Sequence, residues 1–261
     1  MQLCRSLVAE SRYKEKAGRY RKAQENNRRI HTMCTSIISN GNKTIIGFNL
    51  DILDMEYRVV AEEDKVYIAI HDDQEGWLPL FGANSRGDFV AMPTCWPFDE
   101  RSNPANADSL NIINLDIDLL LRKKTLDEIK VIAEHEAVSS VPGVTFQSQL
   151  SDSSGNVLQI IPGQGIRYLS KPQYAVLTNF SPFKGSTEKH PWMGLDRYHK
   201  AVELLENSSE DFDVSDCFEV LKQTSQTICP TVVSMVFDTA ANTVYWCENR
   251  KWDKIEKKKI G

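Results

Sequence analysis

The sequence has no apolar run that approaches the ~20 residues a transmembrane helix needs, so no membrane-spanning segment is expected. No secretory signal is expected in these residues either, because the first of them contain no apolar stretch of ~7–15 residues. Six cysteines are scattered along the 261 residues without a CxxC pair or a regular spacing. In a chain of this length that pattern is typical of free thiols in a reducing compartment. The sequence therefore predicts a cytoplasmic protein with no disulfide framework.

Positive charge is concentrated at the N terminus and scarce elsewhere. Residues 1–33 hold nine Lys/Arg and three Glu, a formal balance of +6. Of the 31 basic and 36 acidic residues in the whole chain, residues 34–261 keep 22 and 33, a balance of −11. Such an acidic body argues against a nucleic-acid surface. We predict a disordered basic leader over residues 1–33, either a propeptide or an upstream extension, and one domain over residues 34–261.

The hydrophobic periodicity changes from that of strands to that of helices and back. Antiparallel hairpins at both ends with helices between them indicate an α+β layered fold. One hairpin signal is Asn40-Gly41-Asn42, and Thr125 followed by Glu128 has the form of a capping box. Strands are expected over residues 35–39, 43–47, 57–61, 65–70, 88–92, 144–150, 157–161, 174–178, 232–238 and 243–247, helices over residues 109–137 in two segments, 195–206 and 214–224, and a solvated lysine tail over residues 251–259.

Met33-Cys34 is the most informative pair in the chain. A cysteine behind a methionine can become the first residue of a mature chain, and its α-amine is then a general base attached to the nucleophile. An unperturbed α-amine titrates near ~7.7–8.0, where a general base works well. Asp51, seventeen residues later at the end of a hairpin strand, can fold back and hold the protonated amine. Asn179, at a strand end, can donate to an oxyanion, and Arg197, at a helix start, can hold an acid.

Each of these residues also has a purely structural interpretation. Cys34 alone reads as a small buried residue, and Asp51 as a turn cap. Asn179 can be interpreted as a residue that stabilises a turn, and Arg197 as an exposed helix residue. Each signal is weak by itself, and only their occurrence together in one order separates the two interpretations.

Taken in order, these residues and their neighbours resemble the choloylglycine hydrolase family of linear amide C–N hydrolases, which includes bile salt hydrolases and penicillin V acylases. Met-Cys-Thr-Ser-Ile at residues 33–37 and Gly-Phe-Asn-Leu-Asp at residues 47–51 look like the start of the family's domain. Residues 81–87 are similar to its Gly-x-Asn-x-x-Gly turn. Further similar segments lie at residues 151–155, 176–182, 196–198 and 245–249, so the matches span nearly all of residues 34–261.

The resemblance implies a four-layer αββα sandwich, the fold of the N-terminal nucleophile hydrolases. It implies that Cys34 is the nucleophile, that its own amine is the base, and that Asp51 holds this amine. It further implies that Asn179 stabilises the oxyanion and positions the substrate, and that Arg197 is the arginine of the site. The thiolate would attack an amide carbonyl and release the amine, and water would then hydrolyse the thioester.

The resemblance calls for no metal and no organic cofactor. His135, between two glutamates, invites a metal-site interpretation, but no other residue at ligand spacing accompanies it, so a helix-surface histidine is the simpler interpretation. The expected partner is a small-molecule N-acyl amide substrate. No nucleic-acid partner is expected, and a homo-oligomer is compatible with the sequence.

Two positions depart from the family's pattern. Phe48 stands where these hydrolases usually carry an arginine, which makes the expected pocket more apolar. Thr94 stands where bile salt hydrolases carry an asparagine, a donor that backbone N–H groups can replace. The gap between Asn179 and Arg197 is also shorter than in bile salt hydrolases. We therefore expect a small or fatty N-acyl amide beside Phe48 and Thr94, with Trp192 at the pocket rim as an acyl contact or a structural anchor.

Three functions are compatible with the sequence. The first is an amidase for linear N-acyl amides, and the second is an acyltransferase in which an amine resolves the thioester. The third is a degenerate, non-catalytic binder of acylated ligands, which Phe48 suggests. With residues 1–33 attached, Cys34 has no free amine, so the chain as written is expected to be an inactive precursor or one whose true start is Met33.

Overall fold

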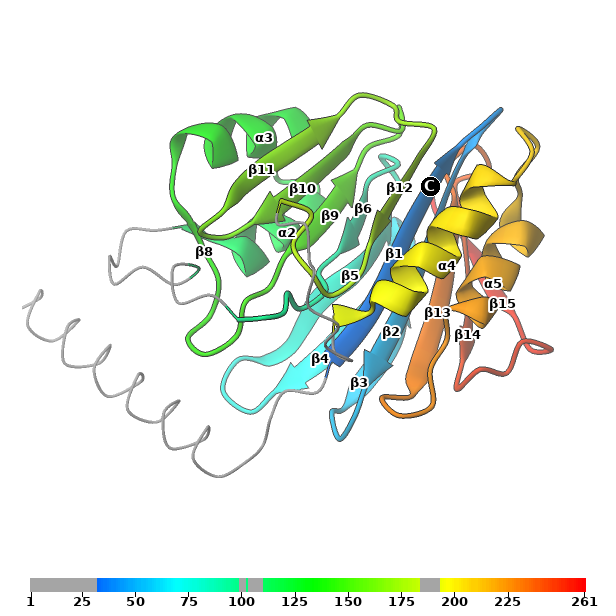
Figure 1. Cartoon of the computed structure of the whole chain (residues 1–261), viewed down its shortest axis with the longest axis horizontal. Helices are drawn as coiled ribbons and strands as arrows, with labels where there is room; N and C mark the ends of the chain where they lie inside the picture. The colour runs from blue at the N-terminus through cyan, green and yellow to red at the C-terminus, as the bar shows by residue number, and fades with distance from the viewer. Residues whose placement is uncertain (1–31, 99–101, 103–109, 184–192) are drawn as a thin grey trace, which may run out of the picture.

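The computed structural model describes residues 32–98, 102, 110–183 and 193–261. In this part of the chain two antiparallel sheets face each other, and helices cover the outer face of each sheet (Figure 1). The four-layer αββα sandwich implied by the family resemblance is therefore confirmed. Within these ranges the helices are all too short or too polar to cross a membrane.

The first sheet contains the N-terminal hairpin and the C-terminal strands. Its order is β12-β1-β2-β13-β14-β15, and α4 and α5 pack on its outer face. The elements are β1 (Thr32–Asn40), β2 (Thr44–Ile52), β12 (Tyr174–Leu177), β13 (Thr231–Asp238), β14 (Thr243–Glu248), β15 (Glu256–Lys259), α4 (Leu195–Glu206) and α5 (Val214–Gln223).

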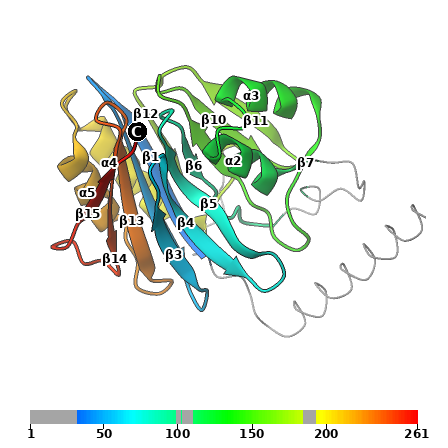
Figure 2. The same ribbon diagram turned by 180° about the vertical axis from the view of Figure 1, so that it is seen from behind.

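The second sheet is formed by the middle of the chain. Its order is β11-β10-β9-β6-β5-β4-β3, and Figure 2 shows α2 and α3 on its outer face. The elements are β3 (Tyr57–Ala61), β4 (Lys65–Asp72), β5 (Gly76–Asn84), β6 (Phe89–Ala91), β9 (Ser148–Ser151), β10 (Val157–Ile161), β11 (Gly165–Leu169), α2 (Ile112–Leu120) and α3 (Leu126–His135), with a small parallel pair of β7 (Leu110–Asn111) and β8 (Val138–Ser139).

Strands β1 and β2 form the central hairpin of the first sheet. They pair without interruption from Thr32 opposite Ile52 to Asn40 opposite Thr44. Nearly every residue of both strands is buried, because helices cover one face and the second sheet covers the other. Burial on both faces explains why the sequence here is a continuous apolar and small-polar run instead of an alternating one.

Apolar side chains fill two layers. Between the sheets, the rings of Phe48 on β2 and Phe81 on β5 stack with centroids 4.8 Å apart. A second cluster, which includes Ile37, Val236 and Leu221, fills the space between the first sheet and helices α4 and α5. Strands β1 and β2 take part in both layers, so the start of β1 lies at the junction of the inner core and a helix-covered face.

Most predicted elements are present in the structure. Helix α4 has its predicted bounds, and α5 ends one residue earlier than predicted. The capping box of α3 is confirmed, because the backbone N–H of Glu128 donates to the Thr125 hydroxyl while the Glu128 carboxylate accepts from the Thr125 N–H. The strand predicted over residues 144–150 is shorter, since only β9 (Ser148–Ser151) pairs continuously.

The sequence does not predict five of the strands in the described residues: β5, β7, β8, β11 and β15. In β5 the alternation is broken by Pro79 and Gly82, and β11 is short and half-buried. Strands β7 and β8 have two residues each, and β7 occupies residues 110–111, which the sequence predicts as the start of a helix. The lysines of residues 256–259 are not a solvated tail, because β15 pairs with β14 along the edge of the first sheet. Pairing with β14 gives the backbone groups of β15 hydrogen-bond partners. The exposed lysine side chains then discourage a further strand from pairing at this edge. Of the predicted leader, Thr32 and Met33 belong to β1, and residues 1–31 lie outside the described residues.

Candidate active site

Cys34 lies near the start of β1, opposite Leu50 of β2, and is buried. Burial raises the pKa of the Cys34 thiol well above its ordinary value, and the nearby carboxyl of Asp51 adds to the rise. A hydrogen bond with the Asp51 backbone and the charge of Arg197 act in the opposite direction. The thiol is therefore protonated near neutral pH while Met33 is attached, and it needs a base to become a nucleophile.

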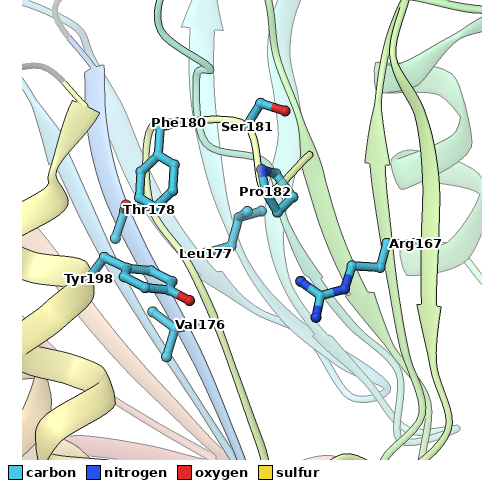
Figure 3. A pocket seen from close by; sticks show the side chains of 8 residues that line it. All are labelled: Arg167, Val176, Leu177, Thr178, Phe180, Ser181, Pro182 and Tyr198. Atoms are coloured by element: carbon cyan, nitrogen blue, oxygen red, sulfur yellow. The ribbon is translucent and has the colours of Figure 1, made fainter. Parts of the chain in front are cut away.

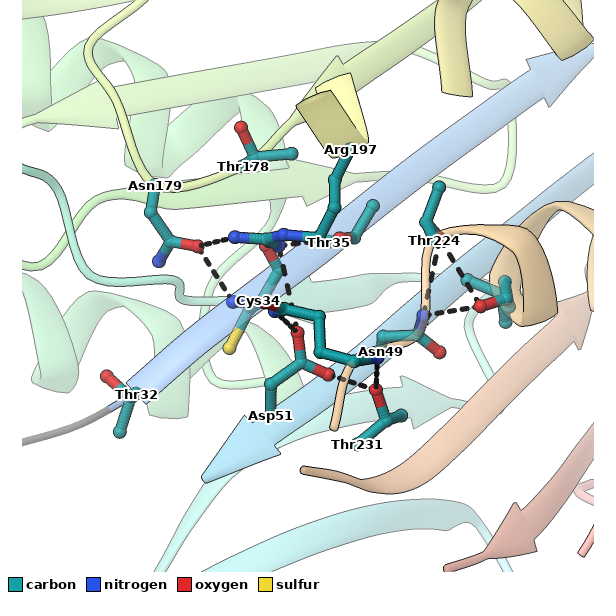
Figure 4. Close-up of polar contacts among 12 residues, drawn as sticks. Thr32, Cys34, Thr35, Asn49, Asp51, Thr178, Asn179, Arg197, Thr224 and Thr231 are labelled. Carbon is teal, nitrogen blue, oxygen red and sulfur yellow. Dashed lines mark hydrogen bonds and ion pairs between the residues drawn. The ribbon is translucent and has the colours of Figure 1, made fainter. Parts of the chain in front are cut away.

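Arg197 reaches the start of β1 from the first turn of α4 (Figure 4). Its Nη1 donates to the Cys34 carbonyl oxygen at 2.5 Å and to the Thr35 hydroxyl at 2.8 Å. Its Nη2 donates to Oδ1 of Asn179 at 2.8 Å. Because the side chain is only 4% exposed, these bonds replace the water that the guanidinium would otherwise bind.

Asn179 follows β12 and contacts the main-chain nitrogen of Cys34. Its Oδ1 accepts the Cys34 N–H at 2.9 Å, in addition to the bond from Arg197. Its Nδ2 donates to both the carbonyl oxygen and the hydroxyl of Thr94, each at 2.9 Å. The amide is therefore fixed at both ends, with its oxygen directed at the nitrogen that would be the α-amine of a chain beginning at Cys34.

Asp51 lies one position beyond the partner of Cys34 on β2 and is fully buried. Its two oxygens accept from the Thr231 hydroxyl and from Nε2 of Gln226, each at 2.6 Å, and Nη1 of Arg197 is 3.7 Å from Oδ2. Burial raises the pKa of Asp51 to about 6, although the charge of Arg197 and these two donors lower it. The carboxyl group consequently titrates close to neutral pH.

The structure brings Thr94 into the same network. Its hydroxyl donates to the carbonyl oxygen of Thr32 at 2.8 Å and accepts from Asn179. Phe48 lies apart from the polar groups, because its ring is fully buried against Phe81 between the two sheets. Trp192 lies outside the described residues.

Several residues that contact the site carry no signal in the sequence. Thr231 and Gln226, the two donors to Asp51, lie at and before the start of β13 and carry no motif. Cys229, interpreted from the sequence as a core thiol, is buried, and its thiol has a hydrogen bond with the Met33 backbone. Burial, followed by the charge of Asp51, raises the pKa of Cys229 to about 12. Only Thr35 could have been found, since it belongs to the Met-Cys-Thr run.

A small cleft of about 110 Å³ opens beside this network, at the edge strand β12 (Figure 3). Thr178 and Phe180, which flank Asn179, line it together with Tyr198 of α4 and Arg167 of β11. Metal-binding groups are not seen in the described ranges, where no three His, Cys, Asp or Glu side chains gather suitably. The site therefore consists of a thiol, a carboxyl, a guanidinium and an amide, with a cleft of apolar and polar residues next to them.

The chain is similar in structure to several solved enzymes. A variant of conjugated bile acid hydrolase from Clostridium perfringens aligns with a TM-score of 0.62 at 13% identity, over 87% of this chain and 92% of that chain. Penicillin V acylase from Agrobacterium tumefaciens aligns with a TM-score of 0.58 at 16% identity, over 87% and 92%. The Caenorhabditis elegans ortholog of N-acylethanolamine-hydrolyzing acid amidase aligns with a TM-score of 0.51 at 17% identity, over 79% and 93%.

These likenesses establish that the chain has the fold of those hydrolases. The sequence itself matches no protein-family model and no curated protein. The fold expected from the short motifs is thus confirmed by three-dimensional similarity at sequence identities where sequence comparison alone finds nothing.

Proposed function

We propose that this protein hydrolyses the C–N bond of a linear N-acyl amide, with Cys34 as an N-terminal nucleophile. The observation that carries the proposal is the hydrogen bond from the main-chain nitrogen of Cys34 to Oδ1 of Asn179. Once the preceding residue is removed, that nitrogen becomes an amine beside its own thiol. An acceptor that binds one of its N–H groups orients the amine, so its lone pair can take the proton of the thiol.

The proposed reaction has two halves. In the first, the amine of Cys34 takes the thiol proton, the thiolate attacks the amide carbonyl carbon, and the ammonium returns the proton to the departing nitrogen. In the second, the same amine deprotonates a water molecule that attacks the thioester and frees the acid. The carboxylate of Asp51 and the guanidinium of Arg197 form a buried pair that holds the surrounding groups in place.

We assign the side-chain amide of Asn179 as a donor to the tetrahedral oxyanion. Its side chain is fully buried, and its Nδ2 donates to the carbonyl oxygen and to the hydroxyl of Thr94, so the bond to the oxyanion replaces one of these two. The other bond to Thr94 and the bond from Arg197 to Oδ1 keep the amide oriented, and donors held in this way stabilise developing negative charge. Thr94 acts in this proposal as the residue that holds Asn179.

The kind of substrate follows from the departures from the family pattern. Phe48 is packed in the inner core, so no cation stands at the position of the family arginine. The three structurally similar enzymes act on conjugated bile acids, on penicillin V and on N-acylethanolamines, as their names state. Because these substrates share an acyl group on nitrogen, we propose a small or fatty N-acyl amide as the substrate of this chain.

The test begins with the intact mass of the purified full chain, which shows whether it begins at Cys34. The protein is then mixed with a panel of N-acyl amides, quenched in acid and analysed for an acyl adduct on Cys34. We expect turnover and a transient thioester that Cys34→Ala abolishes. Cys247→Ala, which removes a buried thiol of the α4 and α5 layer, is the matched control and should keep turnover within about twofold.

Other outcomes contradict the proposal in distinguishable ways. A chain that begins at Cys34 and binds amides without forming an adduct is a non-catalytic binder. A thioester that added amines resolve much faster than water identifies an acyltransferase. A chain that retains residues 1–33 and still hydrolyses amides excludes the α-amine as the base.

A further inference from the structure

Helix α4, which carries Arg197, begins differently from α3 and α5. Helices α3 and α5 start at Thr125 and Asp213, whose side chains accept backbone N–H groups in capping boxes. Helix α4 starts at Gly194, which has a left-handed backbone (φ 65°, ψ 35°) and offers no capping side chain. The left-handed backbone by itself favours glycine here, and the surroundings of its Cα decide what a substitution would meet.

The space above Gly194 is occupied by the guanidinium of Arg197. A Cβ atom built on Gly194 would lie 2.2 Å from Nη2, 2.6 Å from Cζ and 3.0 Å from Nε of Arg197. These distances are far inside van der Waals contact, so any side chain at this position would displace the guanidinium. The head group folds back over the first turn of its own helix, and it can do so only because the Cα of Gly194 is bare.

The displaced atoms are those that make the contacts of the site. Nη1 and Nη2 of Arg197 hold the carbonyl of Cys34, the hydroxyl of Thr35 and Oδ1 of Asn179. An arginine side chain is flexible, so a Cβ at residue 194 could be accommodated by moving the guanidinium while the helix stays in place. The loss would then fall on the site and spare the fold.

The residue before Gly194 ties the same turn to Asn179. The carbonyl oxygen of Met193 accepts the backbone N–H of Asn179 at 3.1 Å and the hydroxyl of Thr178 at 3.2 Å. The turn at residues 193–194 thus fixes the main chain of Asn179 through a carbonyl and its side chain through Arg197. Asn179 and Arg197, which are 18 positions apart, are therefore both held by this turn.

We propose that Gly194 is a positioning residue, whose missing side chain leaves the space in which Arg197 aligns Asn179 and the start of β1. The catalytic part of this inference rests on the proposed amide hydrolysis, whereas the positioning of Arg197 does not. In this role Gly194 touches no substrate and acts through Arg197.

The test compares glycines that share a positive φ but differ in surroundings. In Gly76→Ala (φ 77°) and Gly165→Ala (φ 127°) the new Cβ meets no atom within 4 Å, so these variants report backbone strain alone. Gly194→Ala adds the collision with Arg197 to the strain of a left-handed residue, a strain that Gly76→Ala matches more closely in φ than Gly165→Ala does. Gly194→Asn is the second test variant, because asparagine tolerates the left-handed conformation and still carries a Cβ.

We expect Gly194→Ala and Gly194→Asn to lower kcat about 100-fold, as a misplacement of about 1 Å does at other active sites, whereas the two control variants stay within about twofold. The acid limb of the pH profile should also move to higher pH in the Gly194 variants. Among the described residues, Arg197, Cys34 and Cys229 are the charged or titratable groups that act on or lie against Asp51. Arg197 favours the ionised form of Asp51, as the protonated α-amine of Cys34 also does in a chain that begins at Cys34, and the Gly194 variants displace only Arg197. A purely structural defect would leave that limb unchanged.

A second readout does not depend on activity. The side-chain Nε–H resonance of Arg197, assigned in the full chain by its loss in Arg197→Lys, should be dispersed and slow to exchange in the parent, Gly76→Ala and Gly165→Ala. It should lose both properties in the two Gly194 variants. The double variant Gly194→Ala/Arg197→Lys should be no slower than Arg197→Lys, because both substitutions remove the same contacts.

The inference is overturned if the Arg197 resonance and kcat of Gly194→Ala match those of Gly76→Ala. It is also overturned if the fold loss of kcat in Gly194→Ala/Arg197→Lys equals the product of the losses in the two single variants. A different pattern identifies a failure of the proposed function. If the parent protein turns over no amide, but the resonance changes in the Gly194 variants alone, amide hydrolysis is wrong and the positioning role of Gly194 stands.

Discussion

Each of the two outer helix–sheet interfaces contains one fully buried carboxyl group, and the two groups have different surroundings. Asp51 lies at the end of β2, on the sheet covered by α4 and α5. Asp116 lies on α2, where its carboxyl faces Ser148 of β9 in the second sheet. Both side chains are 0% exposed, so their differences arise from their partners and not from their burial.

The partners differ in number and in charge. Asp51 accepts from Thr231 and Gln226 and lies 3.7 Å from Arg197, and its pKa is raised only to about 6. Asp116 accepts from Ser148 alone, and in the described part of the chain its Oδ1 has no hydrogen-bond partner. Burial therefore raises the pKa of Asp116 well above its ordinary value.

The comparison shows that burial with one neutral donor raises the pKa of a carboxyl group well above its ordinary value, whereas burial together with a cation and two donors leaves a group that ionises near neutral pH. A group in the second state can take part in proton chemistry. We therefore expect substitutions around Asp51 to alter function and matched substitutions around Asp116 to leave function intact.

The largest expected effect is on catalysis. Asp51→Asn should lower kcat by about 10²–10⁴, because it removes the carboxylate that balances Arg197 and orders the start of β1. Asp116→Asn, the matched isosteric change in the other interface, should leave kcat within about twofold. Steady-state kinetics on the best amide substrate measures both values, and equal losses in the two variants would remove the functional distinction between the interfaces.

The next effect is on stability and concerns the cation. Arg197→Gln should destabilise the fold by about 3–5 kcal/mol, because it leaves the carboxylate of Asp51 buried without its counter-charge. Arg167→Gln is the control, since the Arg167 side chain has no hydrogen bond or ion pair with another residue in the described ranges, although its backbone lies in the β10–β11 ladder, and it should change stability by less than about 0.5 kcal/mol. Urea unfolding at pH 8 measures both, and a loss below about 1 kcal/mol for Arg197→Gln would show that the pair is dispensable.

A third effect is the pH dependence of stability. The folded pKa of Asp51 is about 6, above the ordinary value of 3.8, so its contribution is fully present below about pH 4 and is lost as pH rises to 6, an amount on the order of 3 kcal/mol. Asp51→Asn should flatten the stability curve between pH 4 and 6. Asp116→Asn should also flatten the curve at pH values above 4, since burial raises the pKa of Asp116 well above its ordinary value.

Urea midpoints measured from pH 4 to 8 give the slope of stability against pH for the parent and for each variant. This slope does not depend on a constant difference in stability between the proteins. Curves for both variants that remain parallel to that of the parent would contradict the assigned titrations.

The smallest effect comes from removing single donors. Thr231→Val should lower stability at pH 8 by about 1–3 kcal/mol, because its hydroxyl bonds an ionised carboxylate. Ser148→Ala should lower it by about 0.5–1.5 kcal/mol, because its partner Asp116 has a raised pKa and so less tendency to ionise. Thr231→Val should also raise the pKa of Asp51, which moves the acid limb of the activity profile to higher pH, whereas Ser148→Ala should leave that limb unchanged.

Local sequence signals predict the elements that carry the site. The Asn40-Gly41-Asn42 turn predicts the β1–β2 hairpin, and the hairpin in turn places Asp51 beside Cys34. The periodicity of residues 195–206 predicts α4 at its observed bounds. These predictions succeed because turn chemistry and helical periodicity depend on neighbours in the chain.

Predictions that depend on packing fare less well. Phe48 is predicted to line the pocket because it stands where the family usually has an arginine. In the structure its ring lies between the sheets against Phe81, a contact that depends on how β2 and β5 face each other. The lysines of β15 read as a tail because their pairing with β14 involves the backbone and leaves no pattern in the side chains. The roles of Cys34, Asp51, Asn179 and Arg197 in catalysis stay predictions.

The sequence by itself therefore determines the hairpin, the helices and the order of the residues that resemble a hydrolase site. Only the tertiary structure decides which groups meet, such as the nitrogen of Cys34 and the amide of Asn179, which are 145 positions apart. It also decides that Asp51 receives donors from the start of β13 and that Arg197 folds back over the bare Cα of Gly194. The physical reason is that hydrogen bonding, desolvation and close packing act between neighbours in space, and sequence patterns record mainly neighbours along the chain.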